Sequence, residues 1–103
     1  MDADNFKKLC REGKIRWSSH GLARMHERDI SVADVKNCLM NGEIIEEYPD
    51  DFPKPSALIF GYASENKIIH VVCGLDEEFL YFITAYVPNT IKFLDDLKTR
   101  RKK

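Results

Sequence analysis

The spacing of apolar residues changes at Gly42 and divides this chain into two halves. Before Gly42 the apolar positions recur at intervals of three and four, which is typical of amphipathic helices. After it, four apolar runs are each bounded by turn residues, which is typical of strands. Because the helices come first and the strands follow, the pattern predicts an α+β domain.

Two or three helices are expected in the first half, where three segments are bounded by residues that begin or end helices. The third has the clearest signals, since Ser31 and Asp34 approximate a capping box and Ile30 and Val35 occupy the positions of a hydrophobic staple. The predicted helices cover about residues 4–13, 18–28 and 31–41.

The four apolar runs of the second half predict a four-stranded antiparallel meander, because the links between them are short. We expect the N-terminal helices to pack on one face of this sheet. Pro88-Asn89-Thr90 then begins a short C-terminal helix that carries Ile91, Leu94 and Leu97. The predicted strands cover residues 43–48, 56–63, 68–74 and 79–87.

Five side chains fall on the apolar side of their predicted elements, and we expect them to be buried. They are Trp17, Leu39, Ile59, Val71 and Ile83. The three cysteines lie far apart and form no C-x-x-C pair, so we expect free thiols in the core.

The chain has 103 residues, of which 44% are hydrophobic, so it can bury one core. We therefore predict a single domain over residues 1–97 and a basic, disordered tail over residues 98–103. No apolar run approaches the roughly 20 residues that span a bilayer, and residues 1–6 lack the order of a signal peptide. The expected location is the cytoplasm, without contact to a membrane.

The net charge of −1 hides an uneven distribution. Residues 1–40 carry 8 basic and 6 acidic side chains, residues 41–97 carry 3 and 11, and residues 98–103 carry 5 and none. A protein that binds nucleic acid over its whole surface needs an excess of cations throughout. Any site for a polyanion is therefore expected to be local.

The second predicted helix carries a cationic stripe. His20, Arg24 and Arg28 follow one another at intervals of four and therefore lie on one side of the helix. Arginine forms planar, bidentate contacts with phosphate or carboxylate groups, which suits an anion site. An ordinary solvated helix face explains the same pattern, and the sequence leaves both interpretations open.

Two predicted strands carry further candidates. His70 stands among branched apolar residues, and its imidazole suits proton transfer as well as a buried structural role. Thr84 and Tyr86 share one face of the next strand. The hairpin loop places His70 near Ile83 or Thr84, and a shift of one residue decides whether they share a face.

Metal binding is the weaker interpretation of these residues. His20 and His26 are six residues apart on a helix and point to different sides, which argues against a zinc site. The acidic residues between 43 and 51 fit a hard cation or a solvated strand edge. We predict neither a metal nor a cofactor.

Four stretches of the chain together resemble a known family. They are residues 19–30 (SHGLARMHERDI), 41–48 (NGEIIEEY), 70–72 (HVV) and 84–86 (TAY). Their order resembles that of a small prokaryotic family, a domain of unknown function whose hallmark is a helix with His-x-x-x-Arg-Met followed by a meander. That family is similar to the superfamily of barnase-like, colicin-like and RelE-like ribonucleases (BECR), in which RNA meets the sheet face opposite the helices.

The resemblance implies a metal-independent endoribonuclease of the toxin type. It implies that the histidines act as base and acid, that the two arginines hold phosphate charge, that Tyr86 stacks or donates, and that Thr84 orients a neighbour. RNA and an acidic antitoxin protein are the implied partners. The alternative is a non-catalytic protein-interaction module whose polar helix stripe binds a partner. The matching positions are His20, Arg24, Arg28, His70, Thr84 and Tyr86.

Overall fold

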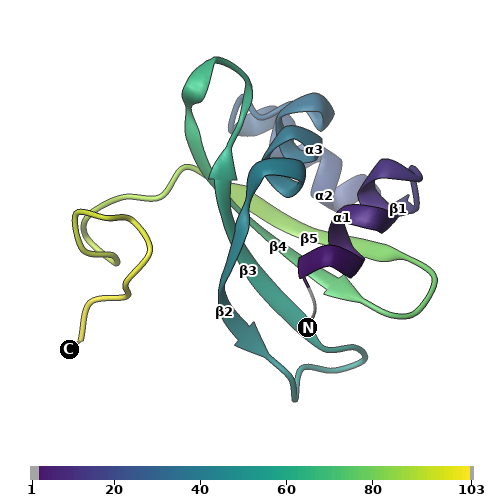
Figure 1. Cartoon of the computed structure of the whole chain (residues 1–103). Coiled ribbons are helices and arrows are strands. Elements are labelled where there is room, and N and C mark those ends of the chain that lie inside the picture. The colour runs from purple at the N-terminus through teal and green to yellow at the C-terminus, as the bar shows by residue number, and fades with distance from the viewer. Residues whose placement is uncertain (1–2, 103) are drawn as a thin grey trace.

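The computed structural model describes residues 3–102, which contain three α-helices and a five-stranded sheet (Figure 1). The helices are α1 (Ala3–Arg11), α2 (Ser19–Glu27) and α3 (Val32–Asn41). The strands are β1 (Ile15–Arg16), β2 (Glu43–Tyr48), β3 (Ser56–Tyr62), β4 (Ile68–Leu75) and β5 (Leu80–Tyr86), with a 3₁₀ turn, η1, at Ser64–Asn66. None of the described helices is long and apolar enough to cross a membrane.

Strands β2 to β5 form the predicted antiparallel meander, and the order of the whole sheet is β1-β5-β4-β3-β2. The prediction of four strands was wrong, because β1 adds a fifth strand that runs parallel to β5. β1 pairs Ile15 with Leu80 and Arg16 with Tyr81. A strand of two residues has no periodicity that a sequence pattern can reveal.

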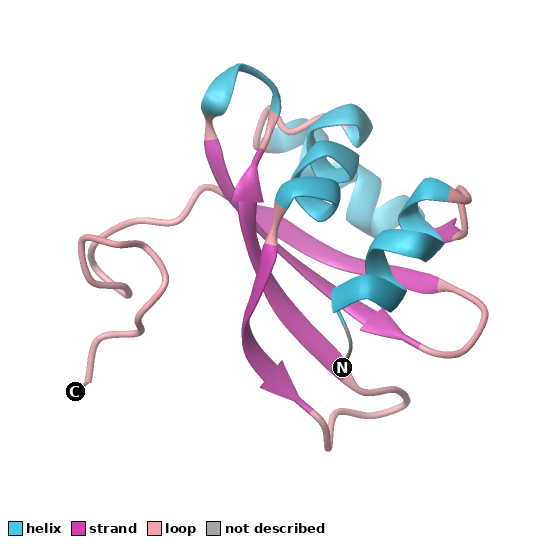
Figure 2. Cartoon of the chain, viewed as in Figure 1, coloured by secondary structure: helices cyan, strands magenta, loops and turns pink. Residues whose placement is uncertain are grey.

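The predicted C-terminal helix was also wrong. Residues 88–102, called the C-terminal segment from here on, form turns and one bridge between Phe93 and Arg100 (Figure 2). The Asp96 side chain accepts hydrogen bonds from two backbone amides that follow it, and Leu97 has a positive φ of 59°. Both features turn the chain back and interrupt the helical course that the apolar spacing suggested.

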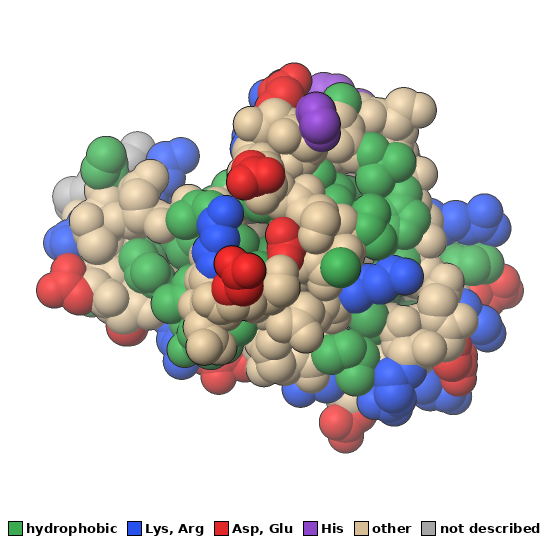
Figure 3. Space-filling view, turned by 90° about the horizontal axis from the view of Figure 1, so that it is seen from above, with side chains coloured by type: hydrophobic (Ala, Val, Ile, Leu, Met, Phe, Trp, Pro, Cys, Tyr) green, Lys and Arg blue, Asp and Glu red, His purple; other side chains and the backbone are tan. Residues whose placement is uncertain are grey.

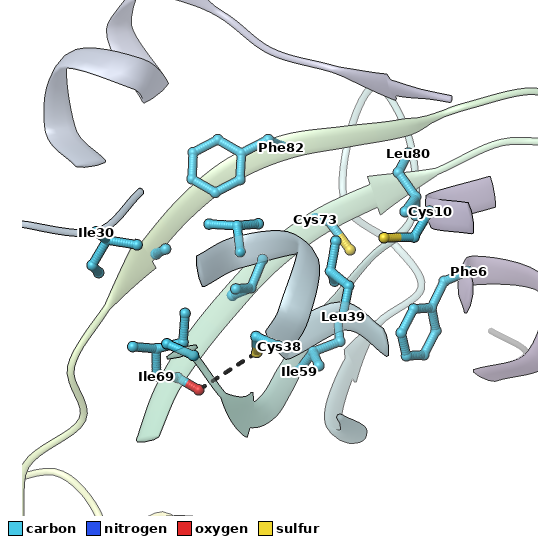
Figure 4. Close-up of a cluster of buried hydrophobic side chains, with 14 of the residues drawn as sticks. Phe6, Cys10, Ile30, Cys38, Leu39, Ile59, Ile69, Cys73, Leu80 and Phe82 are labelled. Carbon is cyan, nitrogen blue, oxygen red and sulfur yellow. Dashed lines mark hydrogen bonds between the residues drawn. The ribbon is translucent and has the colours of Figure 1, made fainter. Parts of the chain in front are cut away.

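The three helices cover one face of the sheet and bury the main core against it (Figures 1 and 4). Leu39 of α3, Ile59 of β3 and Val71 of β4 are buried as predicted, and Trp17 is half-buried. A Cβ added to Gly21 of α2 would lie only 2.9 Å from the Phe82 ring. The absence of a side chain at this position therefore lets α2 pack closely on β5.

All three cysteines are buried free thiols, as predicted, and they belong to this apolar core (Figure 4). Burial raises the pKa of Cys38 and of Cys73 to about 12, and it raises the pKa of Cys10 as well. A thiol with a raised pKa stays protonated near neutral pH and is a poor nucleophile. The cysteines therefore act as apolar core residues.

Ile83 was predicted to be buried, but 49% of its surface is exposed. The ladder between β4 and β5 pairs Val72 with Thr84 and Cys73 with Phe82, so Ile83 is an extra residue in a bulge. The bulge changes which side chains of β5 face the helices, and Phe82 lies in the core in place of Ile83. Strict alternation, on which the prediction depended, does not hold across a bulge.

Candidate functional site

The sheet face opposite the helices, called the polar face from here on, carries most of the predicted site residues. Side chains alternate between the two faces along a strand, and Val71 belongs to the helix-covered core. His70 therefore points to the polar face. The ladder pairs His70 with Tyr86 and not with Ile83 or Thr84, the two expected neighbours, and Thr84 pairs with Val72. His70, Thr84 and Tyr86 consequently share one face.

His70 is fully buried, with 0% of its surface exposed. The Phe93 ring of the C-terminal segment packs edge-on against the imidazole, with 4.7 Å between the ring centroids. Nε2 lies 2.7 Å from the Leu97 carbonyl oxygen, and Nδ1 lies 3.2 Å from the Tyr86 hydroxyl. Because a carbonyl oxygen only accepts, Nε2 carries the proton, and Nδ1 of the neutral ring accepts from Tyr86.

Burial changes the titration of both members of this pair. It lowers the pKa of His70, while the Leu97 carbonyl and the Glu46 charge oppose the change and the Arg100 charge adds to it. Burial also raises the pKa of Tyr86. At neutral pH the imidazole is therefore neutral and the Tyr86 hydroxyl keeps its proton, in agreement with the direction of their hydrogen bond.

Glu46 of β2 extends the polar face. Its two carboxylate oxygens accept hydrogen bonds from Nε and Nη2 of Arg100, each at 3.0 Å. Tyr48 donates its hydroxyl to the same carboxylate, and the Arg100 guanidinium lies 4.9 Å from the centroid of the Phe93 ring. From the sequence, Glu46 was identified only as part of an acidic strand edge, and Arg100 was not identified as a site residue. Glu46 and Tyr48 lie two residues apart on β2 and therefore share one face of the sheet, which was an available signal. Arg100 lies in the segment that the sequence predicts to be a disordered tail.

The C-terminal segment partly neutralises the acidic strand edge. Lys98 forms an ion pair of 2.8 Å with Glu43, in addition to the contact between Arg100 and Glu46. Within residues 3–102, no group of three His, Cys, Asp or Glu side chains is placed to hold a metal ion. The mobility of the basic tail stays a prediction, and its last residue, Lys103, lies outside the described residues.

Arg28 joins the end of α2 to β5. It is the C-cap residue of α2, and its Nη1 donates to the Thr84 hydroxyl at 3.0 Å and to the Ala85 carbonyl at 2.7 Å. Since β1 pairs only with the other end of β5, Arg28 lies along the part of β5 that β1 does not reach. This contact brings a cation to the end of β5 that carries Tyr86.

A cleft of about 380 Å³ opens where these elements meet. Among the described residues, three cations line it, namely Arg28, Lys92 and Arg100, and no acidic side chain does. Figure 3 shows basic and acidic side chains interspersed over the surface seen from above, so a cleft whose charged lining residues are all cations is a local feature. The other lining residues are Tyr86, Val87, Pro88, Asn89 and Phe93.

The structure does not bring His20 and Arg24 into this cleft. Both side chains are exposed on α2, and neither lines the cleft. His20 precedes Arg28 by eight residues, which corresponds to about 12 Å along a helix axis. Four of the six predicted site residues therefore lie together, whereas these two lie apart.

A family model matches most of the chain. The family is described as "Domain of unknown function (DUF4258)", and the match covers residues 17–87, which include all six predicted site residues. No curated protein and no solved structure gives a significant match. The chain belongs to the DUF4258 family, whose function is unknown.

Proposed function

We propose that the protein is a metal-independent endoribonuclease of the toxin type. The observation that carries the proposal is the pair of contacts at the end of β5, from Arg28 to Thr84 and from Tyr86 to His70. A cation, a hydroxyl and an imidazole beside one cleft are the groups that RNA cleavage without a metal needs. The sequence motifs add the similarity to ribonuclease toxins, which is an analogy at the level of the fold.

Tyr86 contacts the ribose in this mechanism, because it lines the cleft while His70 is buried behind it. The 2′-hydroxyl gives its proton to the Tyr86 oxygen as Tyr86 passes its own proton to Nδ1 of His70. The 2′-oxygen attacks phosphorus, the bond from phosphorus to the 5′-oxygen breaks, and the 5′-oxygen takes a proton from water. His70 then returns its proton through Tyr86 to the hydroxide that this water leaves, which restores the neutral imidazole. The products are a 2′,3′-cyclic phosphate and a 5′-hydroxyl end.

Neighbouring groups stabilise the charges that this reaction creates. The proton transfer makes an imidazolium at His70, whose Nε2–H already donates to the Leu97 carbonyl and whose positive charge the Glu46 carboxylate favours. The non-bridging oxygens on phosphorus gain negative charge, which Arg28 stabilises from the edge of β5. His70 thus acts through Tyr86 and does not itself touch RNA.

His20 and Arg24 have no chemical role in this mechanism. Their exposed positions on α2 suit contact with a longer RNA or with an acidic antitoxin protein. The same exposure favours the second candidate function, a non-catalytic module in which the stripe on α2 binds a protein partner.

Incubating the purified protein with mixed RNA in the presence of a chelator tests the proposed function. We expect the wild type to cleave RNA and His70→Ala to lose cleavage. Because His70 is buried, its removal can also unfold the protein. Tyr86→Phe is the sharper variant, since it keeps the ring and removes only the hydroxyl, and we expect it to slow cleavage by about 100-fold or more.

Tyr81→Phe is the matched control. Tyr81 lies on the same strand, but its hydroxyl donates to Asp76 and it does not line the cleft. We expect this variant to cleave RNA at the wild-type rate. Intact RNA after incubation with the wild type would contradict the proposed function, and unchanged cleavage by Tyr86→Phe would contradict the route of the proton.

A further inference from the structure

The cations of the cleft come from two separate parts of the chain. Arg28 follows α2, within the region that the family model matches, whereas Lys92 and Arg100 belong to the C-terminal segment, beyond that region. Like charges repel, so three cations around one cleft are stabilised when an anion binds between them. The cleft is therefore suited to an anionic ligand.

We propose that this cleft binds a phosphodiester group of RNA, with the C-terminal segment supplying two of its three cations. The choice of RNA as the ligand rests on the proposed function. The resemblance to ribonucleases implied Arg24 and Arg28 as the cations that hold phosphate charge. Lys92 and Arg100 are thus new members of the site, and Arg24 is not one of them.

Arg28 is anchored by one nitrogen and has donors left for a ligand. A guanidinium carries five N–H groups, and Nη1 makes both hydrogen bonds to β5. No carboxylate within residues 3–102 forms an ion pair with Arg28. Its Nε and Nη2 groups therefore remain available for two oxygens of one phosphate, the geometry in which arginine binds phosphate best.

Glu46 positions Arg100 without using all of its donors. The carboxylate engages Nε and Nη2, which fixes the plane of the guanidinium. The N–H groups of Nη1 take no part in this contact, and half of the Arg100 side chain remains exposed. A phosphate can therefore bind beside the Glu46 contact instead of replacing it.

The turns of the C-terminal segment position Lys92. The Asn89 side chain accepts from the Lys92 amide at 3.3 Å, and the Lys92 carbonyl accepts from the Arg101 amide at 2.8 Å. The backbone is thus held on both sides, while no carboxylate within the described residues forms an ion pair with the Lys92 side chain. A flexible ammonium on a fixed backbone can adjust to the position of a phosphate in the bound RNA.

The size and lining of the cleft favour a nucleotide over a bare anion. Its volume of about 380 Å³ lies in the range of sites that hold small organic ligands, so it has room for a sugar or a base beside the phosphate. Tyr86 adds an aromatic ring on which a base can stack. The acidic side chains of a peptide do not stack on a ring in this way, so the ring favours a nucleotide.

Binding of a short, labelled 2′-O-methyl RNA at low salt tests the site, because this RNA lacks the 2′-hydroxyl and cannot be cleaved by the proposed route. We expect Lys92→Ala to raise the Kd about fivefold or more and to reduce the salt slope by about one counterion. Lys102→Ala is the matched control, since Lys102 lies in the same segment but does not line the cleft. We expect it to change the Kd less than about twofold.

An equal increase in Kd for the two variants would overturn the site. It would mean that RNA binding depends on the total charge of the segment and not on which lysine lines the cleft. Inorganic phosphate or an acidic peptide that competes as well as unlabelled RNA would overturn the choice of a phosphodiester ligand. RNA binding that depends on Lys92 without cleavage of ordinary RNA supports the site and refutes the proposed function. Cleavage that Lys92→Ala leaves unchanged refutes the site and leaves the proposed function standing.

Discussion

The two faces of the sheet are both covered, but by different kinds of contact. On one face the helices bury an apolar cluster that includes all three cysteines (Figure 4). On the polar face the C-terminal segment covers His70 with the Phe93 ring and the Leu97 carbonyl, and it binds Glu46 through Arg100. The first cover depends on apolar burial, which has no direction, whereas the second combines the packing of one ring with hydrogen bonds, which have strict geometry.

This difference separates the part that stabilises the fold from the part that carries the candidate chemistry. Apolar burial is the dominant favourable term in folding, and most of it lies beneath the helices. Hydrogen-bonded polar groups add little net stability, but they hold side chains in fixed orientations. We therefore expect the helix-covered face to control unfolding and the polar face to control the response to pH and salt.

The largest effect is expected from a cavity beneath the helices. Phe6 is 0% exposed, and Phe6→Ala should lower the free energy of unfolding by about 3–5 kcal/mol. Phe93→Ala removes the same ring from the polar face, where the segment can detach while the sheet stays folded, so we expect a loss of about 1–2 kcal/mol. Urea denaturation measures both values. Equal losses would show that the C-terminal segment unfolds together with the core.

The pH dependence of stability is the next largest effect and comes from His70. Since its pKa is lowered in the folded protein, the unfolded chain binds more protons once the pH falls below the ordinary value of about 6.5. Stability should be constant just above that pH and decline below it, by about 1.4 kcal/mol for each unit by which the pKa is lowered. Carboxylates with lowered pKa values, such as Asp34 and Asp96, lose their contribution to stability only below about pH 4. They therefore do not affect the range in which His70 acts.

Thermal melts between pH 5 and 7.5 measure this decline, and His70→Gln is the variant that should remove it. The Glu46 and Arg100 charges act on His70 in opposite directions, so neither is expected to abolish the effect alone. A wild-type curve that is flat over this range would show that the imidazole is protonated as easily in the folded protein as in the unfolded chain.

A smaller effect is expected from the contact between Glu46 and Arg100. The contact is bidentate, but half of the Arg100 side chain is exposed and water screens the charges. A double-mutant cycle with Glu46→Gln and Arg100→Gln should give a coupling energy of about 0.5–1 kcal/mol. The coupling should decrease when the salt concentration is raised. A coupling energy that does not change with salt would show that the pair is shielded from water, as the contacts beneath the helices are.

The smallest effect is expected at Lys98, whose partner Glu43 is 55% exposed. Exposed ion pairs of this kind contribute little to stability. Lys98→Ala should therefore leave the melting temperature unchanged within error. A clear decrease would show that charge pairing, and not the packing of Phe93 on His70, holds the C-terminal segment to the sheet.

Local signals in the sequence were sufficient to predict much of the helix-covered face. Ser31 with Asp34 forms the expected capping box of α3, and Ser18 caps α2, where Ser18 and Ser19 were both candidates. These interactions join residues within one helical turn, so their signature is visible in any short stretch of the chain. Gly42 also ends α3 where the apolar spacing changes.

The polar face could be predicted only in part, because it depends on contacts between distant segments. His70 and Tyr86 were identified by residue type, but a bulge in β5 set a register that the hairpin loop did not predict. Lys92 and Arg100 were not identified, because the course of the C-terminal segment depends on the packing of Phe93 against His70. No local pattern in residues 88–102 encodes that contact.

The most direct test of the central claim, that Tyr86 and His70 transfer a proton during RNA cleavage, is the chemical nature of the ends left on RNA. An RNA of defined sequence is incubated with the wild type in chelator, and the ends of the fragments are identified. We predict 2′,3′-cyclic phosphate and 5′-hydroxyl ends from the wild type, and fragments that form about 100-fold more slowly, or slower still, from Tyr86→Phe. Fragments with 3′-hydroxyl and 5′-phosphate ends, or RNA that remains intact, would contradict the claim.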